Sequence, residues 1–281
     1  MRYFVAFFLF VFSLLDVQAQ ELRYKEIQGI AYSSSKDSYV QKQCLLDFYY
    51  PEDKKDFTTL IWFHGGGLTS GNRAIPERLK GGDFAVVSVG YRFAPQVRVE
   101  DIIKDGAEAI SWVMKNIANY GGNTQKVVIG GYSAGAYLAL MLALRKEYLA
   151  VHSVDADQLL GVISCSGQAI THFTERQSRH IRDTQPIVDE MAPLYWVRNT
   201  PFPIMLMTGD RELEMLGRYE ENAYLARMLK LCGHKDVKLL EFQGYDHGML
   251  TPALPLVVRQ LKEWEALRLT NSNQKSESTK K

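Results

Sequence analysis

A stretch over residues 126–139, KVVIGGYSAGAYLA, constrains the fold more than any other part of the sequence. Its apolar beginning predicts a buried strand, its glycines a tight turn and its alanine-rich end a helix. Ser133 lies in the turn at the centre of a G-x-S-x-G pattern, where a strained backbone lifts the hydroxyl clear of the strand end. The other interpretation is a glycine-rich turn in which the serine has no chemical role.

Strands and helices are predicted to alternate along most of the chain. Apolar runs predict an edge strand within residues 20–42 and further strands at 44–50, 59–63, 84–89, 159–165, 203–208 and 237–242. Apolar residues at helical spacing predict helices at 99–117, from residue 134 to about 148, at 218–231 and at 254–267. This order predicts an α/β fold whose mostly parallel sheet is covered by helices on both faces. Functional groups are expected at the carboxyl ends of its strands.

The two ends of the chain differ in composition from the predicted domain, which covers residues 20–270. Arg2, an apolar run and the small residue Ala19 predict a signal peptide over residues 1–19, and therefore a secreted or periplasmic domain without a membrane span. An uncleaved anchor is the other interpretation, although the apolar run is short for a bilayer. The polar residues 271–281 predict a disordered tail.

Charge and cysteine content narrow the possible partners. The formal net charge of +1 favours no polyanionic partner such as nucleic acid. No cluster of cysteine and histidine has the spacing of a zinc site. At most one disulfide is possible, because the sequence has three cysteines, all expected as buried thiols: Cys44, Cys165 and Cys232.

A serine hydroxyl is a weak nucleophile at neutral pH unless a histidine takes its proton. His247 follows the last predicted strand in the glycine-flanked sequence GYDHG, so its loop can reach the carboxyl edge of a parallel sheet. It also follows Ser133 in the chain, which is the order expected for this arrangement. The other interpretation of His247 is a surface loop histidine.

A carboxylate that orients the histidine is expected in the turn after the strand at 203–208, which reads TGDRELE. Alignment on the common G-x-x-D form of this turn favours Glu212. Asp210 competes with it, because it lies closer to the strand end. Glu214 comes third. The acid that does not contact the histidine is expected to tie the turn through backbone N–H groups.

The sequence HGGG at 64–67 predicts donors for a developing oxyanion. Without side chains, this loop can bring backbone N–H groups against a carbonyl oxygen, and we expect Gly65 and Gly66 to donate together with Ala134. One such donor typically contributes about 3 kcal/mol to transition-state stabilisation. His64 precedes the serine and is interpreted as a structural residue that holds the loop.

Taken together, these residues resemble an α/β-hydrolase of the esterase/lipase type, nearest its hormone-sensitive-lipase-like and feruloyl- and acetyl-esterase-like branches. The motifs occur in family order over residues 43 to 265: HGGG at 64–67, YRFAP at 91–95, GGN at 121–123, GYSAG at 131–135 and DHG at 246–248. The resemblance implies a secreted serine carboxylic-ester hydrolase with no metal and no cofactor. The short segment before residue 43 leaves no room for an N-terminal helical cap, which favours an open site.

The polar stretch 166–200 predicts an insertion, partly helical, that lies over the site. With export, it favours a small-molecule or saccharide ester as substrate, such as an acetyl or feruloyl ester. An amide hydrolase of the peptidase or formamidase type is the first alternative. A non-catalytic binding protein with the hydrolase fold is the second. The sequence leaves the oligomeric state open.

Overall fold

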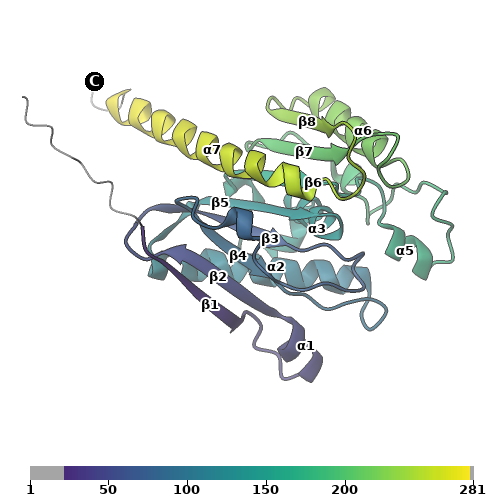
Figure 1. The fold of residues 1–281 in the computed structure, drawn as a ribbon, viewed down its shortest axis with the longest axis horizontal. Helices are drawn as coiled ribbons and strands as arrows, with labels where there is room; N and C mark the ends of the chain where they lie inside the picture. The colour runs from purple at the N-terminus through teal and green to yellow at the C-terminus, as the bar shows by residue number, and fades with distance from the viewer. Residues whose placement is uncertain (1–21, 279–281) are drawn as a thin grey trace, which may run out of the picture.

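An eight-stranded sheet runs through the part of the chain that the computed structural model describes, residues 22–278 (Figure 1). Its strands are β1 (Tyr24–Ala31), β2 (Leu45–Pro51), β3 (Phe57–Phe63), β4 (Ala85–Val89), β5 (Gly122–Tyr132), β6 (Gly161–Cys165), β7 (Ile204–Gly209) and β8 (Val237–Phe242). Their order is β1-β2-β4-β3-β5-β6-β7-β8. β2 is antiparallel to both of its neighbours, and every other pair is parallel. The predicted α/β fold with a mostly parallel sheet is confirmed.

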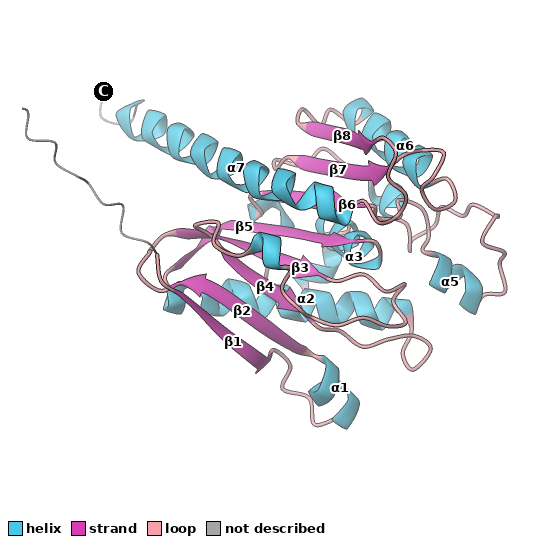
Figure 2. Cartoon of the chain, in the orientation of Figure 1, coloured by secondary structure: helices cyan, strands magenta, loops and turns pink. Residues whose placement is uncertain are grey.

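Helices cover both faces of this sheet (Figure 2). They are α1 (Ser38–Gln43), α2 (Val99–Asn116), α3 (Ala134–Leu144), α4 (Glu147–Ala150), α5 (Phe173–Ser178), α6 (Arg218–Leu231) and α7 (Leu250–Ser278). Apolar side chains of α2, α3 and α6 pack in one buried cluster, and those of α7 pack in a second cluster on the opposite face. The sheet is therefore buried on both sides, as its continuous apolar strands require.

The structure describes neither end of the chain completely, since residues 1–21 and 279–281 lie outside it. The signal peptide at 1–19 lies outside the described residues. The structure continues α7 to Ser278, whereas disorder was expected from residue 271. None of the helices within residues 22–278 is long and apolar enough to cross a bilayer.

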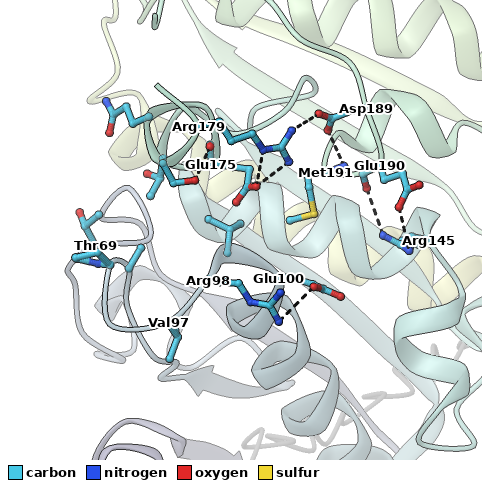
Figure 3. A pocket seen from close by; sticks show the side chains of 16 residues that line it. Thr69, Val97, Arg98, Glu100, Arg145, Glu175, Arg179, Asp189, Glu190 and Met191 are labelled. Atoms are coloured by element: carbon cyan, nitrogen blue, oxygen red, sulfur yellow. Dashed lines mark hydrogen bonds and ion pairs between the residues drawn. The ribbon is translucent and has the colours of Figure 1, made fainter. Parts of the chain in front are cut away.

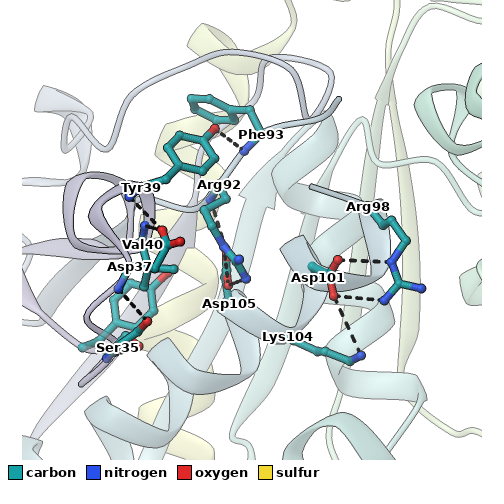
Figure 4. Close-up of polar contacts among 12 residues, drawn as sticks. Ser35, Asp37, Tyr39, Val40, Arg92, Phe93, Arg98, Asp101, Lys104 and Asp105 are labelled. Atoms are coloured by element: carbon teal, nitrogen blue, oxygen red, sulfur yellow. Dashed lines mark hydrogen bonds and ion pairs between the residues drawn. The ribbon is translucent and has the colours of Figure 1, made fainter. Parts of the chain in front are cut away.

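The loop after β4 is fixed by polar contacts to α1 and α2 (Figure 4). Arg92 forms a bidentate ion pair with the buried Asp105 of α2, with an Nη2–Oδ1 distance of 2.6 Å. The backbone N–H of Phe93 donates to the Tyr39 hydroxyl (3.0 Å), and the N–H of Ala94 donates to the carbonyl of Leu68 (2.8 Å). These contacts hold the loop against the HGGG segment.

The three cysteines are free thiols. Cys44 and Cys165 are buried, as predicted. Cys232 is exposed, so its predicted burial is wrong. It is the C-cap residue of α6, and this end of the helix is exposed, as is the neighbouring Leu231. The apolar residues before Cys232 therefore do not imply that it is buried.

Candidate active site

The turn between β5 and α3 holds Ser133 in a strained conformation, with φ 54° and ψ −118°. A Cβ on Gly131 would lie 2.5 Å from the backbone carbon of Gly135, and a Cβ on Gly135 would overlap the carbonyl of Phe63. The N–H of Ser133 donates to the carbonyl of Cys165 on β6 (2.8 Å). Only glycine therefore fits on either side of the serine, and strain of this kind clusters at functional sites.

A chain of hydrogen bonds runs from Ser133 through His247 to Glu214. Oγ of Ser133 lies 2.9 Å from Nε2 of His247, and Nδ1 of His247 lies 2.7 Å from Oε1 of Glu214. The Tyr132 hydroxyl donates to the backbone carbonyl of His247 (2.6 Å) and fixes the loop after β8. The side chain of His247 is 27% exposed and that of Glu214 only 1%. A hydroxyl, an imidazole and a buried carboxylate in this order can generate a nucleophile.

The carboxylate that contacts His247 is Glu214, so the predicted choice between Glu212 and Asp210 is wrong. After β7 the chain coils into one helical turn, in which the N–H groups of Leu213 and Glu214 donate to the carbonyl of Asp210. This turn brings residue 214 back to the sheet edge and leaves Glu212 exposed. Asp210 ties the turn, as the unused acid was expected to do, by accepting from the N–H groups of Glu212 (3.0 Å) and Gly244 (2.8 Å).

Hydrogen bonds hold Glu214 as an anion. Burial raises the pKa of its carboxyl, but donors from His247, the Met215 backbone and the Ser166 hydroxyl outweigh burial and lower the pKa to about 2. Oε2 also accepts from the N–H of Gly209 (3.0 Å). At neutral pH the carboxylate is therefore charged and can hold the proton of His247 on Nδ1.

The HGGG segment, here called the glycine loop (residues 64–67), lies beside the serine turn, because Phe63 on β3 pairs with Gly131 on β5. Gly66 has φ +117°, and a Cβ there would overlap the carbonyl of Ser70. Its own carbonyl accepts from two N–H groups at residues 69 and 70. The loop is therefore folded on itself in a way that only glycine allows.

Three backbone N–H groups are free at this point. Within the described part of the chain, no protein group accepts a hydrogen bond from the N–H of Gly65, Gly66 or Ala134. Ala134 is the first residue of α3, where N–H groups have no partner inside the helix. The structure therefore leaves the predicted oxyanion donors available at neighbouring strand ends.

His64 packs under the glycine loop and does not join the chain of hydrogen bonds. Its Nδ1 lies 2.6 Å from the carbonyl oxygen of Gly65, and its ring stacks on Tyr91 with 4.3 Å between centroids. The Tyr91 hydroxyl donates to the carbonyl of His64 (2.7 Å). Burial lowers the pKa of His64 to about 4, so the ring is neutral at physiological pH. These contacts agree with the structural role expected for it.

A cavity of about 750 Å³ lies beside the glycine loop (Figure 3). Thr69 and Thr174 line it, and their hydroxyls donate to the carbonyls of Gly66 (3.2 Å) and Gly67 (2.5 Å). α5, which belongs to the predicted insertion, forms part of the wall. The insertion therefore borders the glycine loop, and Ser133 is not itself among the lining residues.

The wall of this cavity carries paired charges between apolar patches. Val97 and Met191 contribute apolar surface. The guanidinium groups face carboxylates in the pairs Arg98–Glu100, Arg145–Glu190, Arg179–Glu175 and Arg179–Asp189. Elsewhere in residues 22–278, as here, no three His, Cys, Asp or Glu side chains are grouped to hold a metal ion.

The BD-FAE family model matches residues 46–161. This segment contains the glycine loop and Ser133, but it ends before Glu214 and His247. Among curated proteins, the chain is 26% identical over 230 residues to Esterase LipC of Mycobacterium tuberculosis. This match covers 73% of this chain and 56% of that protein. It is 28% identical over 146 residues to a probable isoprenylcysteine alpha-carbonyl methylesterase, ICMEL1, of Oryza sativa subsp. japonica.

That second match covers 47% of this chain and 34% of the rice protein, so the chain spans only part of the length of both curated relatives. Among solved structures, a truncated form of a carbohydrate esterase from gut microbiota superposes with a TM-score of 0.70 and 17% identity. The superposition covers 88% of this chain and 99% of that one. With the sheet order and the serine turn, the superposition shows that the chain has the α/β-hydrolase fold, and its sequence is similar to esterases over the matched segments.

Proposed function

We propose that the protein is a serine carboxylic-ester hydrolase that uses Ser133, His247 and Glu214 as its triad. The observation that carries the proposal is the unbroken chain of hydrogen bonds from the strained serine to the buried carboxylate, with distances of 2.9 and 2.7 Å. The esterase relatives support the reaction class.

In the first half of the reaction, Oγ of Ser133 bonds to the ester carbonyl carbon while Nε2 of His247 takes the hydroxyl proton. The carbonyl oxygen becomes an oxyanion, which accepts from the N–H groups of Gly65, Gly66 and Ala134. When the C–O bond to the leaving alcohol breaks, His247 gives the proton to that alcohol. An acyl-enzyme remains on Ser133.

Water then repeats the sequence. His247 takes one of its protons, its oxygen bonds to the acyl carbon, and the bond to Ser133 breaks as the proton returns to Oγ. Throughout, Glu214 keeps the hydrogen of His247 on Nδ1 and stabilises the imidazolium. A carboxyl whose pKa is lowered to about 2 suits this role, because it stays charged at neutral pH.

The proposed substrate is an ester of a polar, neutral alcohol such as a saccharide, with an acetyl or feruloyl acyl group. In the cavity beside the glycine loop, guanidinium and carboxylate groups are already paired, so they can exchange hydrogen bonds with hydroxyls without demanding a net charge. Export through a signal peptide at 1–19 belongs to the same proposal, and N-terminal sequencing of the mature protein tests it.

The test is hydrolysis of p-nitrophenyl acetate and of an acetylated xylo-oligosaccharide by the mature chain. We expect wild-type turnover, and a loss of at least about 10⁴-fold in kcat for Ser133→Ala and for His247→Ala. Release of acetate from the oligosaccharide supports the substrate class. A folded wild-type protein that is inert on every ester contradicts the proposal, and turnover of amide substrates in its place would support the amide hydrolase alternative.

A further inference from the structure

A second serine meets the proposed triad from the opposite side of Glu214. Ser166 follows β6 directly and is fully buried. Its Oγ donates to Oε2 of Glu214 (2.7 Å) and lies 3.0 Å from Nδ1 of His247. Its backbone has φ 55°, a conformation that a serine rarely adopts unless its surroundings impose it.

The proton positions in this contact follow from the donors present. The hydrogen of Ser166 points at Glu214, because an ionised carboxylate can only accept. A lone pair of Ser166 therefore faces Nδ1 of His247, where it can accept a share of the Nδ1–H bond. Only the tautomer with hydrogen on Nδ1 satisfies both Ser166 and Glu214, and it is the tautomer whose Nε2 can accept the proton of Ser133.

The first turns of α6 hold the backbone of the segment that begins with Ser166. Arg218 donates from Nη1 to the carbonyl of Ser166. Asn222 donates from Nδ2 to the carbonyl of Gly167 (2.8 Å). Between them on the helix, Glu221 accepts from the N–H of Ala169 (3.0 Å). Side chains from little more than one turn of helix therefore fix the strained segment.

Arg218 is a buried charged residue, and its desolvation is unfavourable for stability. It is 2% exposed, and among residues 22–278 no carboxylate lies within ion-pair distance of its guanidinium, although the charges of Glu221 and Glu214 act on it from farther away. Burial outweighs these two charges and lowers the pKa of Arg218, so the buried cation reduces stability. The role that explains this buried cation is to fix the backbone of Ser166, to whose carbonyl it donates, rather than to stabilise the fold.

We propose that Ser166, held by Arg218, is a positioning residue that fixes the Glu214 carboxylate for His247. The inference rests on the proposed function. Glu214 needs such support, because the side chains that flank it in the turn, Leu213 and Met215, are exposed and pack little. Ser166 supplies one of the two donors that hold Oε2, which keeps Oε1 directed at Nδ1.

The experiment compares Ser166→Ala and Ser166→Gly with a matched control, Ser164→Ala. Both test variants remove the hydroxyl, and the glycine also relieves the backbone strain. Ser164 is a buried serine two residues earlier, on β6, whose Oγ has no partner among the described residues. The readouts are kcat and KM on p-nitrophenyl acetate, thermal unfolding, and the downfield proton resonance of His247 Nδ1–H.

We expect both Ser166 variants to lower kcat by about 10- to 100-fold with KM nearly unchanged, as the loss of an orienting partner typically does. They should also shift or broaden the Nδ1–H resonance, and Ser164→Ala should do neither. An unshifted resonance and wild-type kcat in Ser166→Gly overturn the inference, as does an equal loss in Ser164→Ala. If the wild type is inert on esters, the proposed function fails, and the resonance still decides the inference.

Discussion

Glu214 and Glu212 are the same residue type two positions apart, and the coil of one turn separates their environments. Glu214 is buried and accepts from His247, Met215 and Ser166, whereas Glu212 is exposed. A spacing rule counts residues from the glycine of the turn and cannot register that coil. The difference in environment is large enough for a pair of substitutions to separate the two residues.

Glu214→Gln is expected to lower kcat on p-nitrophenyl acetate by about 10³-fold or more, because a neutral amide no longer stabilises the imidazolium and permits the wrong tautomer. Glu212→Gln, the matched control, should stay within about twofold of wild type. Steady-state kinetics at neutral pH measures both. Comparable losses in the two variants would show that the turn adopts another register in solution.

At the scale of the element, the turn between β5 and α3 packs against the end of β3 so closely that backbone atoms of the two are in contact. A Cβ on Gly135 would overlap the carbonyl oxygens of Phe63 and His64, so the second residue of α3 must lack one. Gly106 in α2 offers a contrast, since a Cβ there would meet a terminal methyl of Leu142 at 2.9 Å, which a rotation can relieve.

Gly135→Ala should therefore reduce the free energy of unfolding by about 2–3 kcal/mol, because rigid backbone must move. Gly106→Ala should change it little, since the better helix propensity of alanine, about 1 kcal/mol, offsets the side-chain contact. Urea denaturation followed by circular dichroism measures both variants. Equal stability of Gly135→Ala and wild type would contradict the packing described for this turn.

These elements also indicate how far the sequence could be interpreted. α6 and β8 have the predicted bounds, because apolar periodicity marks them locally. The pairing of Ser133 with His247 follows from motif and strand order. Ser166 and Arg218 could not be found in this way, since they are 52 residues apart and neither belongs to a local motif. Nor could Glu214, whose role depends on the coil of its turn.

At the scale of the whole molecule, His64 couples the fold to pH. Burial lowers the pKa of its ring from 6.5 to about 4. Above pH 6.5 the folded and unfolded chains both hold neutral His64. Between pH 6.5 and pH 4 the unfolded chain binds a proton that the folded chain does not. The free energy of unfolding therefore decreases as the pH is lowered through this interval. Glu214 adds a second loss at lower pH, between 4.5 and about 2.

The free energy of unfolding should accordingly fall by up to about 3 kcal/mol between pH 6.5 and pH 4 through His64 alone. His64→Gln, which cannot titrate, should have a correspondingly flatter profile over that interval. Urea denaturation at a series of pH values gives both curves. Parallel profiles for the two proteins would mean that His64 is not the group responsible.

The strand order has a consequence for how the molecule is made. From β5 onward each strand adds to the same growing edge of the sheet, so the ribosome delivers Ser133 114 residues before the histidine that pairs with it. A nascent chain can build the serine turn against β3 before the histidine of the proposed triad has been made. The proposed triad is therefore completed late in translation, when the loops after β7 and β8 dock, and shorter nascent chains carry the serine motif without its base.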